Sequence, residues 1–328
     1  MNVLTTNVLS KLFKREQPIF PPDNMVRHFD TPVPEGSFVS SVWPRNSLLR
    51  APYTYDTTHK DYDANAARNF PNSIINSHMS CRNELFGELL TMSKNGCVPF
   101  PVWKKILRDA MKELRRDPYA AEIFKRQRYI EKYFRGARKK HKARYEPGWV
   151  NIEDALFLYW LVRRMNPKTI VQTGVANGLS LSVMTLALVK NRSHGRIYAI
   201  DYPQVFDPAQ AQWTIEGHTY GAVVPEEKTS GWMVPEMYRD RVEVWCGDAK
   251  ALLPDLVSSV DSIDFFYHDS DHSYLHMMFE FREALRRLSK GGIIVSDDIA
   301  WNSSLWDLAD EYAVPAYNFR GSMGVAFF

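Results

Sequence analysis

The sequence predicts an α/β fold with a mostly parallel sheet, and three observations support that prediction. Short apolar runs alternate with helix-like segments from residue 151 onward, which is typical of parallel strands joined by helices. A glycine-containing turn follows the first of these runs, and acidic residues stand directly after several others. Because open α/β sheets bind ligands at the carboxyl ends of their strands, the same pattern predicts where a site lies.

The elements of this region can be placed in order along the chain. Asn151 is a good helix cap, and Glu153 and Asp154 fall in the first turn, where the helix dipole favours negative charge. The alternation of apolar runs and turns then sets the remaining boundaries. We expect helices over 151–164, 180–190 and 274–288, strands over 169–172, 196–200, 241–245, 263–267 and 292–296, and an antiparallel hairpin over 315–328.

The first 150 residues differ in character from the rest. Prolines punctuate an irregular start, and a helical pattern appears only from Pro101 to Tyr145. A chain of 328 residues is long enough for two units. We therefore predict a mainly helical and irregular accessory region over 1–150, which drives homo-oligomerisation or completes a substrate pocket, and an α/β domain over 151–328.

The composition is that of an ordinary globular protein. No apolar run approaches the roughly 18 residues that a membrane-spanning helix needs, and Met1 to Gln17 lacks the apolar core of a signal peptide. The three cysteines, Cys81, Cys97 and Cys246, have no metal-type spacing, which suits a reducing compartment. We expect a cytoplasmic protein without a membrane span.

A net charge of +3 conceals one strongly basic segment. Residues 125–144 contain ten Lys or Arg against one Glu, interleaved with Tyr129, Tyr133 and Phe134. Such a segment could bind nucleic acid or an anionic substrate. A solvated helix face explains the same residues, and no base-selecting motif accompanies them, so nucleic acid is not the favoured partner.

Acidic residues gather after two of the expected strands. Asp269 follows the strand over 263–267, and Asp297 and Asp298 follow the strand over 292–296. Three carboxylates at one sheet edge repel one another unless something positive lies between them. A hard, oxygen-seeking cation such as Mg²⁺, or another divalent cation, is the simplest candidate. Alternatively, Asp297 and Asp298 cap the next segment, while Asp271 is interpreted as a structural acceptor at a helix start.

A glycine loop connects the first strand to its helix. Gln172, Thr173, Gly174 and Gly178 belong to this loop, and Ser180 opens the helix. Glycines allow a tight turn and a close backbone approach to a ligand. These five residues are the predicted cofactor-binding loop, although a purely structural turn would use the same glycines.

Two further carboxylates stand at strand ends that a nucleoside could reach. Asp201 ends the second strand, where it can accept hydrogen bonds from both ribose hydroxyls. Asp248 follows the third strand, where it can accept a hydrogen bond from an adenine amino group. Together with the glycine loop, these positions predict an adenosine-containing cofactor.

These motifs resemble those of the class I S-adenosylmethionine-dependent methyltransferases. The likeness is strongest to metal-dependent O-methyltransferases of the catechol and caffeoyl-CoA type, and it extends to the group of macrolide-sugar methyltransferases and cephalosporin hydroxylase-like proteins. It covers about residues 151–328. The resemblance implies a Rossmann-like methyltransferase sheet, with S-adenosylmethionine and a divalent metal as cofactors.

The resemblance also implies roles for particular residues. Asp269, Asp297 and Asp298 match the family's metal ligands, and Trp301 follows where the caffeoyl-CoA type also carries Trp. His272 occupies the position of the family's catalytic Lys, so it is the expected base. A His at this position favours a sugar-like or natural-product hydroxyl over a catechol as the small-molecule substrate.

The same residues allow other functions. A non-haem iron hydroxylase would need two histidines and a carboxylate, and His268 and His272 flank Asp269 on nearly adjacent backbone. Three further alternatives are a nucleic-acid methyltransferase that uses residues 125–144, a non-catalytic methyltransferase-like subunit, and a dinucleotide dehydrogenase. His268 is expected to point to the opposite face of the sheet, and it is left outside the predicted site.

The connection over 202–240 is long for an α/β unit. It contains Trp213, His218, Tyr220, Trp232 and Met233. Long connections at a ligand-binding edge often serve as lids or substrate walls, and an aromatic-rich lid would suit stacking on a sugar or a ring. An inserted pair of packed helices would explain the same aromatic residues.

Overall fold

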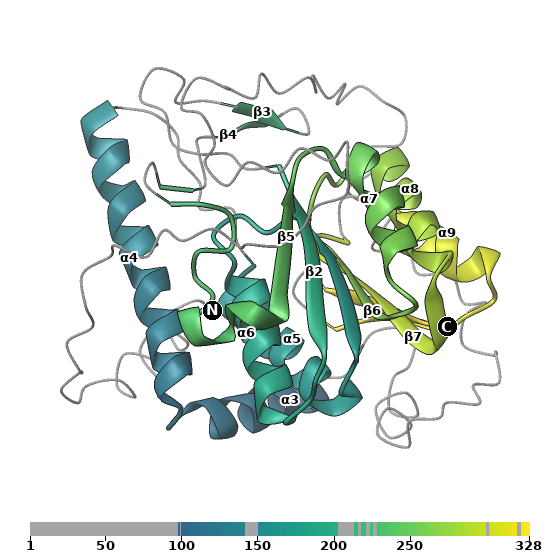
Figure 1. Cartoon of the computed structure of the whole chain (residues 1–328), viewed down its shortest axis with the longest axis horizontal. Helices are drawn as coiled ribbons and strands as arrows, with labels where there is room; N and C mark the ends of the chain where they lie inside the picture. Colours follow the sequence, from purple (N-terminus) through teal and green to yellow (C-terminus); the bar gives the residue numbers. More distant parts are fainter. Residues whose placement is uncertain are drawn as a thin grey trace.

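The computed structural model describes residues 98, 100–141, 150–202, 213–215, 218–220, 224–225, 228–299, 302–319 and 323–328. In this part of the chain, seven strands form one mixed sheet flanked by helices (Figure 1). The α/β prediction is therefore confirmed. The strands of the sheet are β1 (Thr169–Thr173), β2 (Arg196–Asp201), β5 (Val242–Cys246), β6 (Ile263–His268), β7 (Leu288–Ser296), β8 (Ala316–Asn318) and β9 (Gly324–Phe327).

The sheet order is β5-β2-β1-β6-β7-β9-β8. The five strands from β5 to β7 pair in parallel, whereas β9 is antiparallel to both β7 and β8. The predicted C-terminal hairpin is thus confirmed. Thr173 of β1 pairs with Ile200 of β2 and with His268 of β6, and His268 pairs with Ser296 of β7. This register brings the residues that follow β1, β2, β6 and β7 to the same edge of the sheet.

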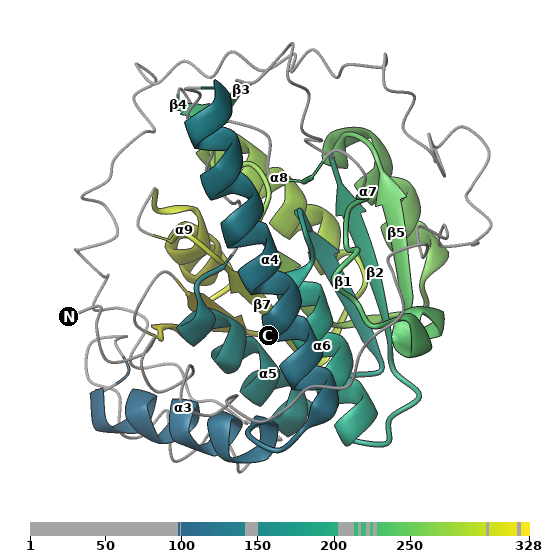
Figure 2. The same cartoon turned by 90° about the vertical axis from the view of Figure 1, so that its left-hand side faces the viewer.

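Helices cover both faces of the sheet, as Figures 1 and 2 show from two directions. Strand alternation explains the two layers. On β6, Phe265 and Tyr267 pack toward α5 and α6, whereas Phe266 packs toward α7, α8 and α9. The described helices are α3 (Phe100–Leu114), α4 (Pro118–His141), α5 (Ile152–Met165), α6 (Leu179–Lys190), α7 (Ala249–Ser259), α8 (Tyr274–Leu285) and α9 (Ser304–Glu311).

Several boundaries differ from the sequence prediction. The helix expected over 274–288 ends at Leu285, because Leu288 already belongs to β7 and pairs with Ile263 of β6. Helices α7 and α9, the short helix Glu236–Arg241 and the hairpin of β3 (Trp213–Ile215) and β4 (His218–Tyr220) were not predicted. Most of these elements are short, so their periodicity is weak in the sequence.

The helical pattern over 101–145 corresponds to two helices separated by a turn. Asp117 ends this turn, and its carboxylate accepts hydrogen bonds from the backbone N–H groups of Tyr119 and Ala120, at 2.9 and 3.0 Å. Pro118 begins α4, a position where its missing N–H is harmless. The sequence alone did not separate the two helices, because apolar residues continue through the turn.

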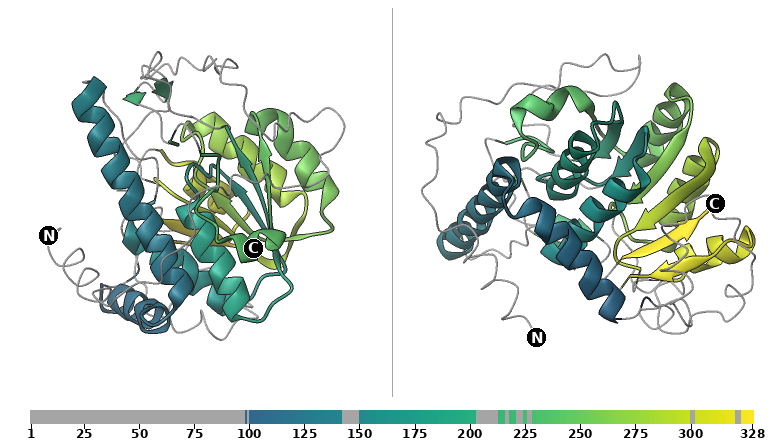
Figure 3. Two further views of the ribbon diagram at one scale, coloured as in Figure 1. Left: turned by 60° about the vertical axis from the view of Figure 1, so that its left-hand side comes forward. Right: turned by 90° about the horizontal axis from the view of Figure 1, so that it is seen from below.

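Helices α3 and α4 pack against the α5–α6 layer (Figure 3). The ring centroids of Trp103 on α3 and Phe157 on α5 lie 5.4 Å apart. Tyr159 of α5 donates a hydrogen bond of 2.8 Å to Glu113 of α3. These described residues of the predicted accessory region therefore share one hydrophobic core with the sheet. None of the described helices is long and apolar enough to cross a membrane.

Candidate active site

The glycine loop after β1 is built around two glycines with left-handed backbone angles. Gly174 has φ +77°, and a Cβ at this position would lie 1.8 Å from the carbonyl oxygen of Asp269. Gly178 has φ +89°, and a Cβ there would lie 2.6 Å from the Cα of Gly231. Only glycine permits these two backbone approaches. The loop therefore lies directly against the segment that follows β6 and against the connection near residue 231.

Gln172 and Ser180 stabilise the loop from within. The Gln172 amide nitrogen donates hydrogen bonds to the Gly174 carbonyl at 2.6 Å and to the Ser180 hydroxyl at 2.8 Å. The Gln172 Oε1 atom is buried and accepts no hydrogen bond within the described part of the chain. An acceptor in that state favours a ligand that can donate, such as an ammonium group.

Thr173 is buried at the end of β1, but its side chain points away from the loop. Its hydroxyl donates a hydrogen bond of 2.5 Å to Glu280 on α8. Its carbonyl accepts a hydrogen bond of 2.9 Å from the Asp269 N–H. Thr173 thus contributes backbone to the predicted cofactor loop, while its side chain belongs to a different cluster.

Asp201 ends β2 as predicted and is almost fully buried. Its Oδ1 accepts hydrogen bonds from the N–H groups of Val175 at 2.8 Å and Ala176 at 3.2 Å, and its Oδ2 accepts one from the Ser230 hydroxyl. Burial raises the pKa of the Asp201 carboxyl, and these hydrogen bonds oppose that rise. The carboxylate therefore holds the glycine loop in place at the predicted nucleoside edge.

Asp248 has a second, structural role that sequence reasoning missed. It is the N-cap of α7, and its carboxylate accepts a hydrogen bond of 2.8 Å from the Lys250 N–H. Asp at a helix N-cap is common, so this role could have been recognised from the following apolar run. The position after β5 still places Asp248 at the same sheet edge as Asp201.

The three predicted metal-binding carboxylates follow neighbouring strands. The Asp297 N–H donates a hydrogen bond of 2.9 Å to the His268 carbonyl, which continues the pairing of β6 with β7 beyond the strand ends. Burial, together with the negative charges of Asp297 and Asp298, raises the pKa of the Asp269 carboxyl well above its usual range.

Asp298 has an uncommon backbone conformation and is hydrogen-bonded to Asp297. Asp298 adopts a left-handed φ of +48°, which is costly for a residue with a Cβ. Its backbone N–H donates a hydrogen bond of 2.8 Å to the Asp297 carboxylate. Helix α9 begins only at Ser304, after Ser303, so neither aspartate is its N-cap. The alternative capping interpretation of this pair is therefore wrong for α9.

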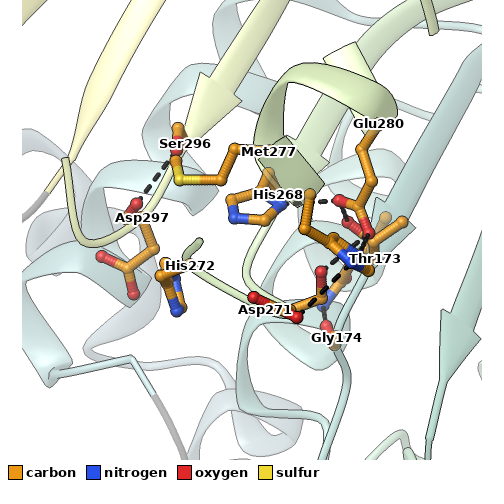
Figure 4. Close-up of polar contacts among 12 residues, drawn as sticks. Thr173, Gly174, His268, Asp271, His272, Met277, Glu280, Ser296 and Asp297 are labelled. Carbon is orange, nitrogen blue, oxygen red and sulfur yellow. Dashed lines mark hydrogen bonds and ion pairs between the residues drawn. The ribbon is translucent and has the colours of Figure 1, made fainter. Parts of the chain in front are cut away.

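His272 lies beside Asp297, as Figure 4 shows. Its Nε2 is 4.0 Å from Asp298 Oδ2, and its side chain is mostly buried. Asn302 Nδ2 donates a hydrogen bond of 2.7 Å to the His272 carbonyl, which ties this loop to the segment before α9. Asp271 accepts a hydrogen bond of 2.8 Å from the Ser273 N–H, which agrees with its predicted structural role.

Within the described ranges, no three His, Cys, Asp or Glu side chains form a preassembled metal-binding group. The Tyr267 hydroxyl donates a hydrogen bond of 3.2 Å to Asp269 Oδ2, so one oxygen of this carboxylate already has a partner. Trp301 lies outside the described residues. The assignment of Asp269, Asp297 and Asp298 as metal ligands stays a prediction.

His268 is predicted to lie outside the site, but in the structure its ring contacts that of His272. Its ring faces α8, as strand alternation predicts, and lies 5.6 Å from the Phe281 ring between centroids. The loop after β6 then returns to the same face, so that the His268 and His272 ring centroids are only 5.1 Å apart. The two rings therefore meet, although they are four positions apart at the end of a strand.

A buried polar cluster around Glu280 was missed by sequence reasoning. Glu280 lies on α8 and is fully buried, with Thr173, His268, Ser270 and His276 around its carboxylate. The available signal was a carboxylate and a histidine four residues apart on the apolar stripe of a helix. A charged residue on a buried stripe is rare unless it is paired.

The connection between β2 and β5 is described only in part. Residues 231–233 contact the glycine loop: the Gly231 N–H donates to the Ala176 carbonyl at 2.9 Å, and Trp232 Nε1 donates to Asn177 Oδ1 at 2.8 Å. Residues 203–212 fall outside the described part of the chain. The lid interpretation therefore stays a prediction, whereas the contact of residues 231–233 with the loop is observed.

Part of the basic segment over 125–144 is also described. On α4, Gln127, Ile130 and Phe134 are buried, while Tyr129 is 43% exposed. Arg126 pairs with Glu122 and donates a hydrogen bond of 2.8 Å to the Trp232 carbonyl. Arg126, one of the basic residues, therefore makes contacts within the protein, and no described contact of this segment supports nucleic-acid binding.

Known proteins that are similar to this chain are methyltransferases. Residues 171–299 match the family model described as "Methyltransferase domain". A protein of Arabidopsis thaliana named after caffeoyl-CoA O-methyltransferase is 30% identical over 169 residues, which cover 51% of this chain and 61% of that protein. A flavonoid 3′,5′-methyltransferase of Vitis vinifera is 28% identical over 161 residues, which cover 48% and 57% of the two chains. The match thus spans about three-fifths of the length of these relatives.

Among solved structures, an O-methyltransferase from Bacillus cereus in complex with S-adenosylhomocysteine aligns with a TM-score of 0.43 and 17% identity, over 61% of this chain and 90% of that one. The family match begins within β1, contains the glycine loop, and ends after the acidic pair that follows β7. The hydroxylase and dehydrogenase alternatives are not favoured by these matches. Residues 171–299 are therefore similar to methyltransferase domains.

Proposed function

We propose that this protein transfers the methyl group of S-adenosylmethionine to a hydroxyl oxygen of a small molecule, with a divalent cation held by Asp269, Asp297 and Asp298 and with His272 as the base. The observation that carries the proposal is the 4.0 Å distance between His272 Nε2 and Asp298 Oδ2, next to a glycine loop that lies against the backbone of Asp269, in a region that matches a methyltransferase domain. The names of the plant relatives support oxygen as the methyl acceptor.

The loop residues fit S-adenosylmethionine as the methyl donor. Gln172 Oε1 is a buried acceptor that could receive a hydrogen bond from the ammonium group of the methionine part. Asp201 and Asp248 stand at adjacent strand ends where ribose hydroxyls and an adenine amino group can be recognised. In this proposal Asp201 keeps its bonds to the loop and uses its remaining lone pairs for the ribose.

The carboxylates fit a divalent cation by charge and by donor type. Oxygen donors suit Mg²⁺, and burial together with the charges of Asp297 and Asp298 raises the pKa of Asp269, so a cation would stabilise its ionised form. When bound, such a cation would lower the pKa of a substrate hydroxyl and orient its oxygen. Asp298 is partly exposed, at 42% of its side chain, so this edge of the cluster is open to solvent.

The side chains of the protein then supply orientation and proton acceptance. A neutral imidazole at His272 can accept the hydroxyl proton while the oxygen forms its bond to the methyl carbon and the carbon–sulfur bond breaks. The products are a methyl ether, S-adenosylhomocysteine and a protonated His272, and nearby carboxylates stabilise that positive charge. The glycine loop sets the position of the methyl donor relative to this base.

The experiment is a paired titration and activity assay on the full chain. S-adenosylmethionine is titrated calorimetrically into wild type and Asp297→Asn, and methyl transfer is measured with Mg²⁺ and with a chelator. We expect the variant to bind S-adenosylmethionine within about 3-fold of wild type, which corresponds to less than 1 kcal/mol. Its methyl transfer should fall about 100-fold or more, because metal polarisation contributes several kcal/mol.

Asp261→Asn is the matched control, because Asp261 is an exposed aspartate that precedes β6, away from the carboxyl ends of the strands. It should behave as wild type in both assays. Full activity of wild type in the chelator would overturn the metal assignment, and a lack of S-adenosylmethionine binding would overturn the methyltransferase proposal itself.

The acceptor is proposed to be a sugar or natural-product hydroxyl. The support is the histidine at position 272, where the resemblance to catechol-type enzymes would place a lysine. A panel of sugar, macrolide, flavonoid and caffeoyl acceptors distinguishes these classes by kcat/KM. Preference for the phenolic acceptors would contradict this part of the proposal and leave the methyl-transfer proposal standing.

A further inference from the structure

Glu280 is the centre of a buried hydrogen-bonding cluster behind the proposed active site (Figure 4). Its carboxylate is fully buried and has four partners. They come from β1, from the end of β6, from the loop after β6 and from α8 itself. The partner atoms are Thr173 Oγ1 at 2.5 Å, His268 Nδ1 at 2.6 Å, Ser270 Oγ at 2.7 Å and His276 Nε2 at 2.8 Å.

The chemistry of a carboxylate determines which atoms carry protons in this cluster. Burial alone would raise the pKa of the Glu280 carboxyl, but His268 and His276 and their hydrogen bonds hold that pKa well below its usual range. An ionised carboxylate only accepts hydrogen bonds. Each of its four partners must therefore donate, and the Nδ1 atom of His268 must carry a proton.

The other ring nitrogen of His268 is then an acceptor. A protonated ring would bury an Nε2–H donor without an acceptor, whereas a neutral ring with its proton on Nδ1 leaves a lone pair on Nε2. This Nε2 is buried and has no hydrogen-bond partner in the part of the chain that the structure describes. Figure 4 shows the His268 ring between Glu280 on one side and His272 with Asp297 on the other.

The His268 ring also limits where His272 can lie. The two ring centroids are 5.1 Å apart, and their planes meet at 75°. A displacement of His268 would therefore displace His272, whose Nε2 is 4.0 Å from Asp298. Glu280 thus contacts the proposed base through one intermediate ring, without lying in the site itself.

We propose that Glu280 is a positioning residue, which holds His268 in the Nδ1–H tautomer and thereby orients His272 and directs the His268 Nε2 lone pair toward the active site. This inference rests on the function proposed above. A carboxylate that orients a histidine in this manner typically matters for activity about 10- to 100-fold when it is removed. A purely structural role would instead affect folding and all ligands together.

The first test uses Glu280→Gln in the full chain. The amide has the shape of the carboxylate but donates as well as accepts, so it cannot receive hydrogen bonds from all four partners. We expect kcat to fall about 10- to 100-fold, with the Kd for S-adenosylmethionine within about 3-fold of wild type. Nitrogen-15 NMR of the labelled histidines should show the Nδ1–H signature of His268 in wild type and its loss in the variant.

The matched control is Glu283→Gln, on the same helix but paired with Arg286 near the surface. It should leave kcat, the Kd and the His268 signature unchanged. If Glu280→Gln keeps the wild-type kcat, or if kcat and S-adenosylmethionine binding fall in parallel with a large loss of Tm, the positioning role is wrong.

His268→Asn is the second variant, and it covers the case in which Glu280→Gln does not fold. The asparagine amide nitrogen can replace Nδ1 as the donor to Glu280, while nothing replaces Nε2. We expect this variant to fold and to lose kcat to a similar extent, and a wild-type kcat would overturn the proposal. If no acceptor is methylated even by wild type, the proposed function fails, whereas the NMR signature still tests the Glu280–His268 pair.

Discussion

Gly174 and Asp269 come from adjacent strands, and their backbones meet at the carboxyl edge of the sheet. The Asp269 N–H donates to the Thr173 carbonyl at 2.9 Å, directly before Gly174 in the chain. The glycine loop and the acidic segment are therefore positioned by each other. A side chain inserted between them should disturb both the cofactor site and the acidic site.

We predict that Gly174→Ala loses S-adenosylmethionine binding. The new Cβ would lie 1.8 Å from the Asp269 carbonyl oxygen, and φ is +77°. The backbone angle alone should reduce the free energy of unfolding by about 1–3 kcal/mol, and the steric contact adds to this. Calorimetric titration and urea unfolding provide the two measurements.

Gly136→Ala is the control for this prediction, because a Cβ at Gly136 in α4 meets nothing within 4 Å. It should be neutral or stabilise the protein by up to about 1 kcal/mol. Wild-type cofactor affinity in Gly174→Ala would contradict the tight backbone approach seen in the structure.

A second residue-scale prediction concerns pH. The pKa of Glu280 is lowered in the folded protein, against 4.5 for an ordinary glutamate. Below pH 4.5 the unfolded chain therefore binds a proton that the folded protein does not, so the free energy of unfolding must decrease as the pH falls. The stabilisation by ionised Glu280 is fully present above pH 4.5 and is lost as the pH falls through the lower, folded-state pKa.

Urea unfolding of wild type and Glu280→Gln from pH 3 to pH 7 measures this effect, with the range chosen around the ordinary pKa of 4.5. The difference in stability between the two proteins should be constant near neutral pH and should shrink below pH 4.5. A difference that does not change with pH would show that the carboxylate charge is not what stabilises the cluster.

At the scale of elements, α4 contacts the connection before β5, and this connection in turn contacts the glycine loop. Arg126 on α4 donates a hydrogen bond of 2.8 Å to the Trp232 carbonyl, and its guanidinium carbon lies 5.8 Å from the Trp232 ring centroid. Trp232 Nε1 in turn donates to Asn177 at 2.8 Å. Trp232 thus connects α4, a helix of the predicted accessory region, to the glycine loop.

We predict that Trp232→Phe weakens S-adenosylmethionine binding by up to about 10-fold. The phenylalanine keeps most of the apolar contact and loses the hydrogen bond to Asn177, which is worth about 1 kcal/mol. Trp306→Phe on α9, at the opposite face of the sheet, is the control and should keep wild-type affinity. Equal affinities of all three proteins would show that Trp232 does not hold the loop.

The same elements show where sequence reasoning reaches its limit. Apolar runs and glycine turns predicted β1, β2, β5, β6 and β7 to within about two residues at their carboxyl ends, because these strands are buried on both faces. The helix before β7 was predicted too long. Its end is set by the pairing of Leu288 with Ile263, a contact that periodicity does not report.

At the scale of the whole molecule, α3 and α4 belong to the same core as the sheet. Trp103 is 3% exposed and packs on Phe157 of α5. Glu113 accepts hydrogen bonds from both Tyr159 and Arg163 of α5, at 2.8 and 2.6 Å. The boundary predicted near residue 150 therefore separates two regions of sequence whose described parts pack together.

We predict a single cooperative unfolding transition for residues 100–141 and the sheet. Trp103→Ala should lower the free energy of unfolding by about 3–5 kcal/mol, because it leaves a cavity between α3 and α5. Phe100→Ala on the same helix should have a small effect, since Phe100 is 39% exposed. Calorimetry that resolved a separate transition for the helical region would contradict the shared core.

The α/β class, the carboxyl edge that carries the proposed site, and the positions of Asp201, Asp269 and Asp297 at strand ends could all be predicted from the sequence. These properties depend on hydrophobic periodicity and turn residues, which act over a few neighbouring positions. The contacts between side chains at this edge depend on the packing of the whole fold. Thr173 and Glu280 are 107 residues apart, and Asn177 and Trp232 are 55 apart. Such pairs form because helix packing brings distant buried polar groups together, and each group must then find a partner.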